Sequence, residues 1–334
     1  MRVAAFTPGR TVPSARFRVR QFIPHLRALG IQLEEMSTTT EAYPPAVRWR
    51  RPLWGARRLV EIAPLVVRSR SCDRVILQRE MISTMVTLEP FTGRPRLLDV
   101  DDSVHLHHGG VAARRLAQLC DRVIAGNNYL AEIYRRWNSD VVVLPTAIDS
   151  DVFVPGPSAR TEEEIVIGWI GTSANHRYLT GIEPPLAAAL MARPSLRLRV
   201  ISDRAPDFAI IDPDRWSFAK WREDTEVAEV QAMNIGIMPL EDSEWARGKC
   251  SFKMLQYMAC GLPVVVSPVG NNHEVLREAL LGVAAAEPGE WIEALLALAD
   301  SPGLRAKMGA AGRSVIERLY ATKVIAPRLA KYLA

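Results

Sequence analysis

Two lysines and a glutamine stand close together in the second half of the chain. The helix expected near residues 251–260 brings Lys249, Lys253 and Gln256 to positions i, i+4 and i+7, so they form one polar stripe beside an apolar face. The first turn of a helix offers unpaired N–H groups and a partial positive charge. The pattern therefore predicts a binding site for a diphosphate at the start of this helix, near Ser251, and a solvated lysine pair is the alternative.

Acidic and imidazole side chains gather after another apolar strand, in the order Asp99, Asp101, Asp102 and His105. An Asp-x-Asp pair can hold a divalent cation against a diphosphate, whereas the alternative is a capping aspartate followed by a solvated loop. Histidine is a side chain type that can orient or carry a proton near neutral pH, and a structural histidine is the other interpretation of His105. A functional role for part of this group is favoured because it ends a strand.

Short apolar runs alternate with helical stretches along the whole chain, and this is typical of parallel sheets covered on both faces. Strands are expected at 3–6, 31–33, 74–77, 96–100, 122–125 and 141–144, and again at 165–170, 198–201, 216–219, 235–238, 264–266 and 283–286. Helices are expected at 18–29, 53–68, 80–89, 111–119 and 128–137, with Asn127 as N-cap, and at 176–191, 225–232, 251–260, 272–280, 289–300 and 303–333.

The alternation restarts after a polar segment rich in proline and glycine, at 155–164, which we interpret as a linker. The pattern predicts an α/β protein of two doubly wound, Rossmann-like domains that face a cleft. We place the domains at residues 1–156 and 163–312, and a helical tail at 313–334. Ligands of such sheets bind beyond the carboxyl ends of the strands.

Length and composition agree with two globular domains, since 334 residues are too many for one ordinary core. No apolar stretch of about 18 residues is present, and the start of the chain does not resemble a signal peptide. The four cysteines show no C-x-x-C spacing, so we expect reduced thiols in a cytoplasmic protein. The sequence motifs of four common enzyme classes are missing or incomplete: NAD-dependent enzymes, P-loop proteins, zinc proteases and hydrolases with a nucleophile elbow. These classes are therefore disfavoured.

The charge is uneven: residues 1–150 hold 22 arginines, no lysine and 14 acidic residues, a net charge of +8, whereas the remainder carries −3. The excess points to an anionic partner, or it reflects genome composition. Within it, the segment 48–58 combines Arg48, Arg50, Arg51, Arg57 and Arg58 with Trp49 and Trp54. This segment predicts contact with an anionic membrane surface, and the alternative is a solvated helix whose tryptophans pack on the sheet.

Beyond these patterns, the stretch SFKMLQYMACGLPVVVSPVGNNHEVL resembles the donor-binding region of family 4 glycosyltransferases, retaining enzymes of the GT-B fold. The segment GWIGTS at 168–173 resembles the start of their second domain. PSARFR, LLDVDDSVH and LPTAIDSDVF are similar to a bacterial subgroup that builds cell-surface polysaccharide. The resemblance covers nearly the whole chain.

The resemblance implies a hexosyltransferase that moves a hexose from a nucleotide-diphosphate sugar to a hydroxyl of a glycan or lipid-linked glycan, with retention and without a metal or other cofactor. It also implies a C-terminal helix that crosses back to the first domain. The donor-binding residues that it implies are Gly171, Thr172, Ser173, His176, Trp221, Ser251, Gln256, Asn271 and Glu274. Lys249, Lys253 and His105 become candidates for catalysis, and Arg16, Arg18, Asp101 and Asp102 for the cleft wall on the acceptor side.

The chain departs from the family pattern at two positions. Many members carry two glutamates eight positions apart in the donor-binding stretch, where this chain has Gly248 and Gln256. Two rival functions stay open: a non-hydrolysing nucleotide-sugar epimerase, which shares the two-domain fold, and a protein that binds nucleotide-sugars without turnover, which the missing acidic pair suggests. Nucleic-acid binding is disfavoured because no recognition motif accompanies the basic excess. A cytoplasmic location is expected, the inner face of the membrane included.

Overall fold

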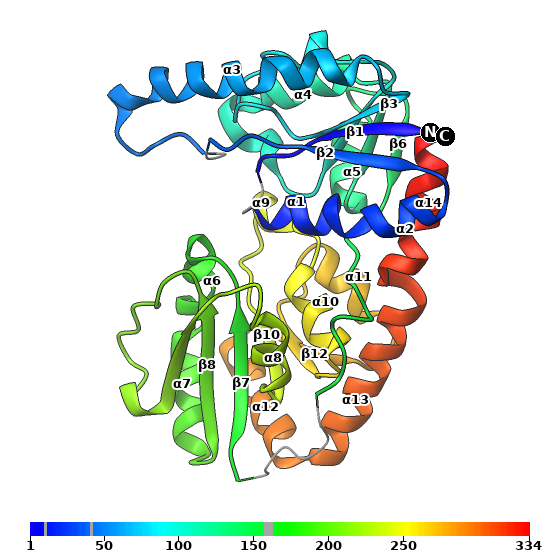
Figure 1. The fold of residues 1–334 in the computed structure, drawn as a ribbon. Coiled ribbons are helices and arrows are strands. Elements are labelled where there is room, and N and C mark those ends of the chain that lie inside the picture. Colours follow the sequence, from blue (N-terminus) through cyan, green and yellow to red (C-terminus); the bar gives the residue numbers. More distant parts are fainter. Residues whose placement is uncertain (10–11, 41–42, 157–162) are drawn as a thin grey trace. The chain divides into compact units, whose positions relative to one another are not determined.

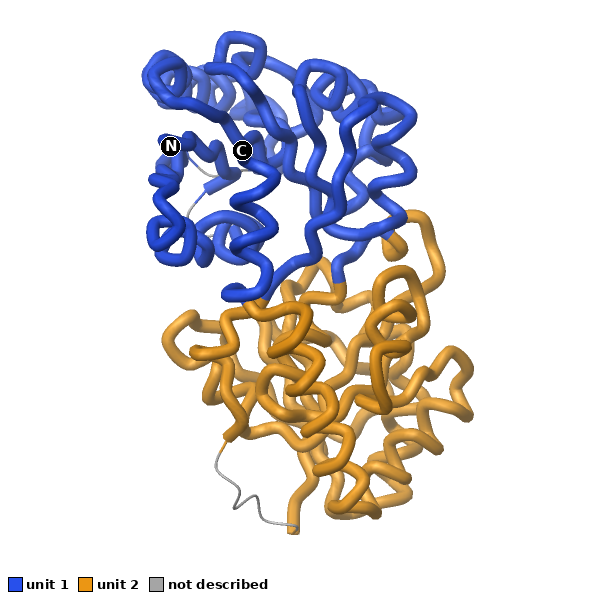
Figure 2. The backbone as a smooth tube through the Cα atoms, turned by 90° about the vertical axis from the view of Figure 1, so that its right-hand side faces the viewer, with its two compact units in different colours: residues 1–147, 248–250, 322–334 blue, residues 148–247, 251–321 orange. Residues whose placement is uncertain are grey.

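The computed structural model describes residues 1–9, 12–40, 43–156 and 163–334, and most of the expected linker, 157–162, lies outside the described residues. The chain forms two compact units, shown in Figure 2. The first unit contains residues 1–147, 248–250 and 322–334, and the second contains 148–247 and 251–321. The chain therefore passes from one unit to the other four times. Its second stretch in the first unit is only three residues long, 248–250.

The first unit is built on a six-stranded parallel sheet of order β2-β1-β3-β4-β5-β6. Figure 1 labels β1, β2, β3 and β6 of this sheet. Its strands are β1 (Arg2–Phe6), β2 (Gln32–Met36), β3 (Arg74–Gln78), β4 (Arg96–Val100), β5 (Arg122–Ala125) and β6 (Val141–Val143). Its α-helices are α1 (Pro13–Arg18), α2 (Ile23–Ala28), α3 (Arg51–Ser69), α4 (Val111–Leu119), α5 (Asn128–Tyr134) and α14 (Thr322–Leu333), and its short 3-10 turns are η1 (Arg20–Phe22), η2 (Arg48–Arg50), η3 (Glu89–Phe91) and η4 (Val104–Gly110).

Helices cover both faces of this sheet, as its uninterrupted apolar strands require. Helices α3, α4 and α5 bury Ile62, Leu116 and Leu130 in one core. Helices α2 and α14 bury Leu26 and Leu329 in the other. The C-terminal helix α14 is thus part of the first unit, the arrangement that the family resemblance implies.

The second unit has a six-stranded parallel sheet of order β12-β11-β10-β7-β8-β9. Its strands are β7 (Ile165–Ile170), β8 (Leu196–Ser202), β9 (Trp216–Lys220), β10 (Ile235–Met238), β11 (Val264–Val266) and β12 (Gly282–Ala284). Its helices are α6 (His176–Thr180), α7 (Glu183–Ala192), α8 (Glu226–Gln231), α9 (Glu244–Arg247), α10 (Phe252–Ala259), α11 (Asn271–Leu276), α12 (Pro288–Asp300) and α13 (Pro302–Val315), with short turns η5 (Ser173–Asn175) and η6 (Pro213–Arg215) and a π-helical segment η7 (Ile316–Tyr320).

Helix α10 is fixed on its sheet by Tyr257, which is fully buried. The Tyr257 hydroxyl accepts a hydrogen bond from the Ile170 N–H at 2.9 Å and donates to the Ile237 carbonyl at 3.2 Å. Its ring occupies the space that a side chain at Gly236 would fill. These contacts hold α10 against both β7 and β10.

Several sequence expectations need correction. The helix expected at 80–89 is wrong: Arg79 takes a left-handed φ of 63°, and the Glu89 carboxylate accepts from the N–H groups of Met81 and Thr87, which closes a turn instead. The helix expected at 18–29 is broken into α1, η1 and α2 near Pro24, because proline lacks an N–H group and collides with the preceding turn.

Two further helices differ from expectation. The helix expected at 176–191 is divided into α6 and α7, whose first turn holds Pro184 and Pro185. The tail expected to be helical throughout is interrupted at Ala321, whose ψ of 142° is extended. The four cysteines are free and buried, in agreement with the prediction of thiols.

Candidate functional site

The loop after β7 carries four of the predicted donor-binding residues, Gly171, Thr172, Ser173 and His176. The Ser173 N–H donates to Asp203 Oδ1 at 2.6 Å and the Ser173 hydroxyl to Oδ2 at 2.7 Å. Asp203 follows β8 directly, so the loop is held by the carboxyl end of the neighbouring strand. Sequence reasoning missed Asp203, although its position after a strand is a signal that finds such residues.

His176 lies at the base of the same loop. Its Nε2 is 3.0 Å from the Ser202 hydroxyl, and its ring centroid is 5.5 Å from that of Trp169. Burial lowers the pKa of His176 below its ordinary value of 6.5, so the neutral imidazole predominates at pH 7. His176 can therefore offer a hydrogen bond, but it adds little positive charge to the loop.

Lys253, in the first turn of α10, lies against this loop. Its Nζ is 5.5 Å from the ring centroid of Trp169, and a Cβ built on Gly171 would stand 2.5 Å from Lys253 Cε. The absence of a side chain at Gly171 therefore lets the lysine pass close to the backbone. A cation and a helix N-terminus meet here at the end of a parallel strand, an arrangement suited to an anionic group.

Ser251 and Asn271, also predicted for the donor, lie beside each other. Ser251 is the N-cap residue of α10 with a left-handed φ of 58°, and its hydroxyl accepts from Asn271 Nδ2 at 3.0 Å. Glu274 lies exposed in the first turn of α11, where a carboxylate stabilises the helix. The second unit thus gathers Ser251 and Asn271 around the same helix end that carries Lys253.

Trp221 and Gln256 meet at a carboxylate that the sequence did not single out. Glu226 Oε1 accepts from Gln256 Nε2 at 2.8 Å and from Trp221 Nε1 at 3.3 Å. Glu226 and Gln256 are buried, whereas Trp221 is 36% exposed. An acid therefore stands next to Gln256, although position 256 itself has none.

Lys249 does not share the helix of Lys253, so the predicted polar stripe is wrong. Helix α10 begins at Phe252, Gln256 is buried, and Lys249 belongs to the three-residue stretch 248–250 of the first unit. There, the side chain of Asn127 donates to the carbonyls of Gly248 and Lys249 at 3.0 and 3.2 Å.

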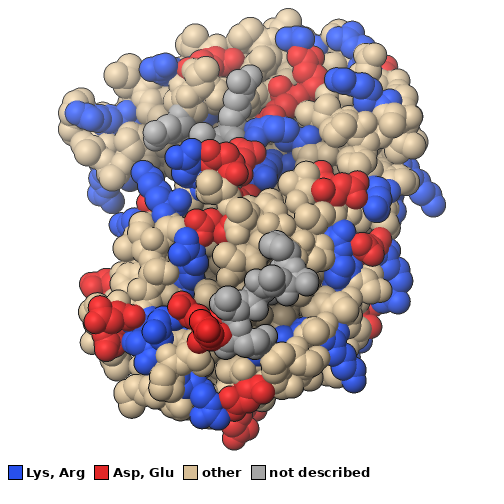
Figure 3. Space-filling view, turned by 60° about the horizontal axis from the view of Figure 1, so that its bottom comes forward, with Lys and Arg blue, Asp and Glu red and all other residues tan. Residues whose placement is uncertain are grey.

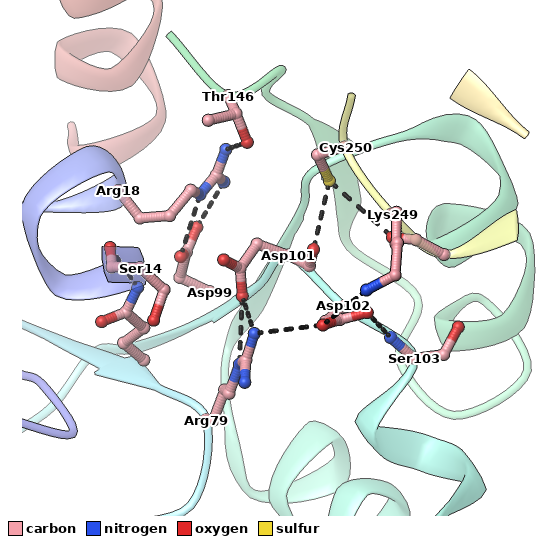
Figure 4. A network of polar contacts seen from close by, with 12 residues as sticks. Ser14, Arg18, Arg79, Asp99, Asp101, Asp102, Ser103, Thr146, Lys249 and Cys250 are labelled. Carbon is pink, nitrogen blue, oxygen red and sulfur yellow. Dashed lines mark hydrogen bonds and ion pairs between the residues drawn. The ribbon is translucent and has the colours of Figure 1, made fainter. Parts of the chain in front are cut away.

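Lys249 joins a charged network at the carboxyl ends of β3 and β4 (Figure 4). Its Nζ is 3.8 Å from Asp102 Oδ2, and Arg79 Nη2 is 2.6 Å from Asp101 Oδ1 and 4.0 Å from Asp102. The Cys250 thiol donates to the Asp101 carbonyl at 3.3 Å. Burial alone would raise the pKa of Asp101, but Arg79 and Arg18 hold it below its usual range, so Asp101 is ionised at neutral pH.

The predicted acceptor-side residues differ in environment. Arg18 is 4% exposed, and its guanidinium is bound by Asp99 at 2.5 Å and by the Leu144 carbonyl at 2.8 Å, so we assign Arg18 to the core of the unit. Arg16 stacks over Phe17 at 4.7 Å. His105 packs near Tyr129 and Tyr134, with ring centroids 6.4 and 6.3 Å away.

The metal interpretation of the aspartates is not supported by their surroundings. Asp99 and Asp101 each face an arginine, and no group of three His, Cys, Asp or Glu side chains suited to a metal occurs within the described ranges.

Basic and acidic side chains are interspersed on the face drawn in Figure 3. None of the described helices is long and apolar enough to cross a membrane.

Part of the chain matches a known protein family. Residues 164–301 match the model described as "Glycosyl transferases group 1". Sucrose-phosphate synthase from Thermosynechococcus elongatus has a similar structure, with a TM-score of 0.76 at 16% identity over 99% of this chain and 98% of that chain. A sequence comparison with curated proteins gives no match.

Two further solved structures are similar over almost their whole length. HepE from Anabaena, in complex with UDP and glucose, has a TM-score of 0.72 at 13% identity. The match covers 100% of this chain and 99% of the HepE chain. WaaG, a glycosyltransferase involved in lipopolysaccharide biosynthesis, has a TM-score of 0.67 at 13% identity, with 99% of each chain covered. The two parallel sheets and these matches identify the GT-B fold, residues 164–301 form a group 1 glycosyl transferase domain, and the chain is a glycosyltransferase.

Proposed function

We propose that this glycosyltransferase moves a hexose from a nucleotide-diphosphate sugar to a hydroxyl of a glycan or lipid-linked glycan, with retention and without a metal. The matched family segment and the loop after β7 both lie in the second unit, to which we assign the donor. The structure of HepE with UDP and glucose supports a uridine nucleotide as the first donor to test.

The observation that carries this proposal is the approach of Lys253 to Gly171 at the start of α10. In the transfer, the bond between C1 of the sugar and the diphosphate oxygen breaks, and the acceptor oxygen bonds to C1. The hydroxyl proton leaves with the diphosphate or to water. Negative charge grows on the diphosphate as C1 becomes oxocarbenium-like. An ammonium group and free N–H groups fixed at that position lower the barrier, and losing one such donor costs a factor on the order of 10²–10³.

We assign the nucleoside end of the donor to the group formed by Trp221, Glu226 and Gln256. A half-exposed indole offers a stacking face for a base. Glu226 accepts from the indole N–H of Trp221 and from the amide of Gln256, so this buried pair orients the indole that would meet the base. The acid beside position 256 thus comes from α8, whereas the family that the sequence resembles often has one on the helix itself.

The acceptor side of the proposal rests on the first unit. Lys249, Asp102, Asp101 and Arg79 form a network of two cations and two anions, which fixes these side chains. Asp102 and His105 remain our candidates for contacts with the acceptor hydroxyl. Because Lys249 is paired with Asp102 in the first unit, we assign the charge of the donor site to Lys253 rather than to both lysines.

The test measures UDP release from UDP-glucose with and without an acceptor panel. We expect Lys253→Met to lower kcat about 100-fold or more, Lys253→Arg to keep part of it, and Lys307→Met, an exposed lysine of α13, to keep all of it. Full activity of Lys253→Met would refute the assignment. The anomeric coupling of the product reports retention, and a strict loss of activity in EDTA would refute metal independence. Conversion of the nucleotide-sugar without an acceptor would favour the epimerase, and binding without turnover the non-catalytic protein.

A further inference from the structure

Helix α3 turns an apolar stripe away from the molecule. The side chains that it buries are Arg58, Ile62, Val66 and Ser69. Leu53, Val60 and Val67 are 75%, 73% and 63% exposed, and because they are seven residues apart they lie on one line along the helix. Figure 1 shows α3 as a long helix along the outside of the first sheet.

The rotation of α3 is fixed by polar contacts on its inner side. The guanidinium of Arg58 donates to the carbonyls of Met81, Thr40 and Pro8 at 2.8, 3.0 and 3.1 Å. Glu61 accepts from the N–H groups of Thr39 and Thr40, both at 2.9 Å. Helix α3 buries Arg58 together with Ile62 and Val66, but it also leaves one leucine and two valines exposed on a line, so its outer face needs a separate explanation.

The stripe continues into the turn before the helix. Trp49 in η2 is 75% exposed, so the alternative in which the tryptophans pack on the sheet is wrong for this residue. An exposed indole ring in sequence with exposed aliphatic residues is typical of the boundary between lipid headgroups and acyl chains.

Positive charge surrounds this stripe. From residue 43 to residue 70 the chain contains seven arginines and one acidic residue, Glu61, which is engaged by Thr39 and Thr40. Arg48, Arg50 and Arg51 are exposed next to Trp49, whereas Arg57 and Arg68 are paired with Glu61 and Glu34. An apolar stripe alone would be enough to bind a protein partner. The excess of arginine beside it is complementary in charge to an anionic surface.

We propose that the α3 surface docks on a bilayer that contains anionic lipid. This surface consists of Trp49, Leu53, Val60 and Val67 together with Arg48, Arg50 and Arg51. The apolar side chains would enter the headgroup boundary and the arginines would contact lipid phosphates. The surface reaches well beyond the segment 48–58 to which the sequence pointed. The proposal is independent of the donor and of the reaction.

The experiment is flotation of the full chain with vesicles of phosphatidylcholine alone or with 30% phosphatidylglycerol. We expect binding to the anionic vesicles only, weakened by salt. Each arginine near an anionic surface contributes a factor of about five to partitioning, so replacing Arg48, Arg50 and Arg51 by serine should weaken binding roughly 100-fold. The matched triple replacement by lysine keeps the charge and should keep binding.

The apolar part is tested by Leu53→Glu with Val60→Glu, and the control is Met191→Glu, since Met191 is 80% exposed in the second unit. The double variant should lose flotation, and the control should not. The UDP-glucose assay without vesicles and the thermal melting curve show that each variant is folded. Equal binding to neutral and anionic vesicles, or retained binding by the double variant, would overturn the proposal. A dimer in sedimentation velocity that the α3 variants abolish would assign this face to a second copy instead.

Discussion

Replacing Gly171 by alanine tests how closely Lys253 must be placed. The new Cβ would stand 2.5 Å from Lys253 Cε and 2.9 Å from Cη2 of the buried Trp169 ring. Carbon atoms in contact are normally about 3.5 Å or more apart, so the lysine end must move by about 1 Å. Misplacing a reacting group by that much costs on the order of 100-fold in rate, or about 3 kcal/mol in the barrier.

The assay is the steady-state rate of UDP release from UDP-glucose, compared between wild type, Gly171→Ala and Gly289→Ala. Gly289 lies in the first turn of α12 of the same unit, and a Cβ there meets nothing within 4 Å, so this variant should keep its rate. We expect Gly171→Ala to lower kcat more than it raises KM. A folded Gly171→Ala with wild-type kcat would refute the reasoning that Lys253 must lie at that spot. Should Gly171→Ala fail to fold, Lys253→Met gives the same test without a steric clash.

Three further predictions concern stability. Asn127→Ala removes the N-cap of α5 and the donor to the Gly248 carbonyl, so urea denaturation should show a loss of about 2 kcal/mol, with a smaller loss for Asn127→Asp. Hydrogen bonds from Thr40 lower the pKa of Glu61 to about 2 in the folded protein, from 4.5, so its stabilisation is present above about pH 4.5 and is lost as the pH falls toward 2. The melting temperature of Glu61→Gln should accordingly be lower than wild type at pH 7 and equal to it near pH 2. Gln256→Glu would replace the amide that donates to Glu226 by a second carboxylate, so its melting temperature at pH 7 should be lower than that of wild type.

The sequence predicted the two parallel sheets because period and composition act locally. Strands such as β7 and β10 are short apolar runs, and Asn127 caps α5 as its residue type suggests. The break near Pro24 was missed because the apolar pattern was followed through a proline that itself marks a boundary. The turn after Arg79 was missed because it depends on the left-handed backbone of Arg79 and on the carboxylate of Glu89, eight residues from Met81.

The site was predictable where it follows strand ends and less so where it depends on tertiary pairing. Gly171 and Lys253 come together because Tyr257 of α10 bonds to the backbone of both β7 and β10. Helical spacing placed Lys249 on α10, but the carbonyls of its segment bond to Asn127, more than a hundred residues away. No local pattern reveals such a contact, nor the pairing of Gln256 with Glu226 from another helix.

The four passages of the chain between the units have a consequence for engineering by domain exchange. A fragment that stops near residue 147 lacks Ile325, Ala326, Leu329 and Leu333, which fill one apolar face of the first sheet. Such a fragment would expose that face and aggregate, however well its strands form. A chimaera that takes its second unit from a related enzyme should therefore retain residues 322–334 and 248–250 of this chain. Both segments belong to the first unit, and residues 322–334 cover one face of its sheet.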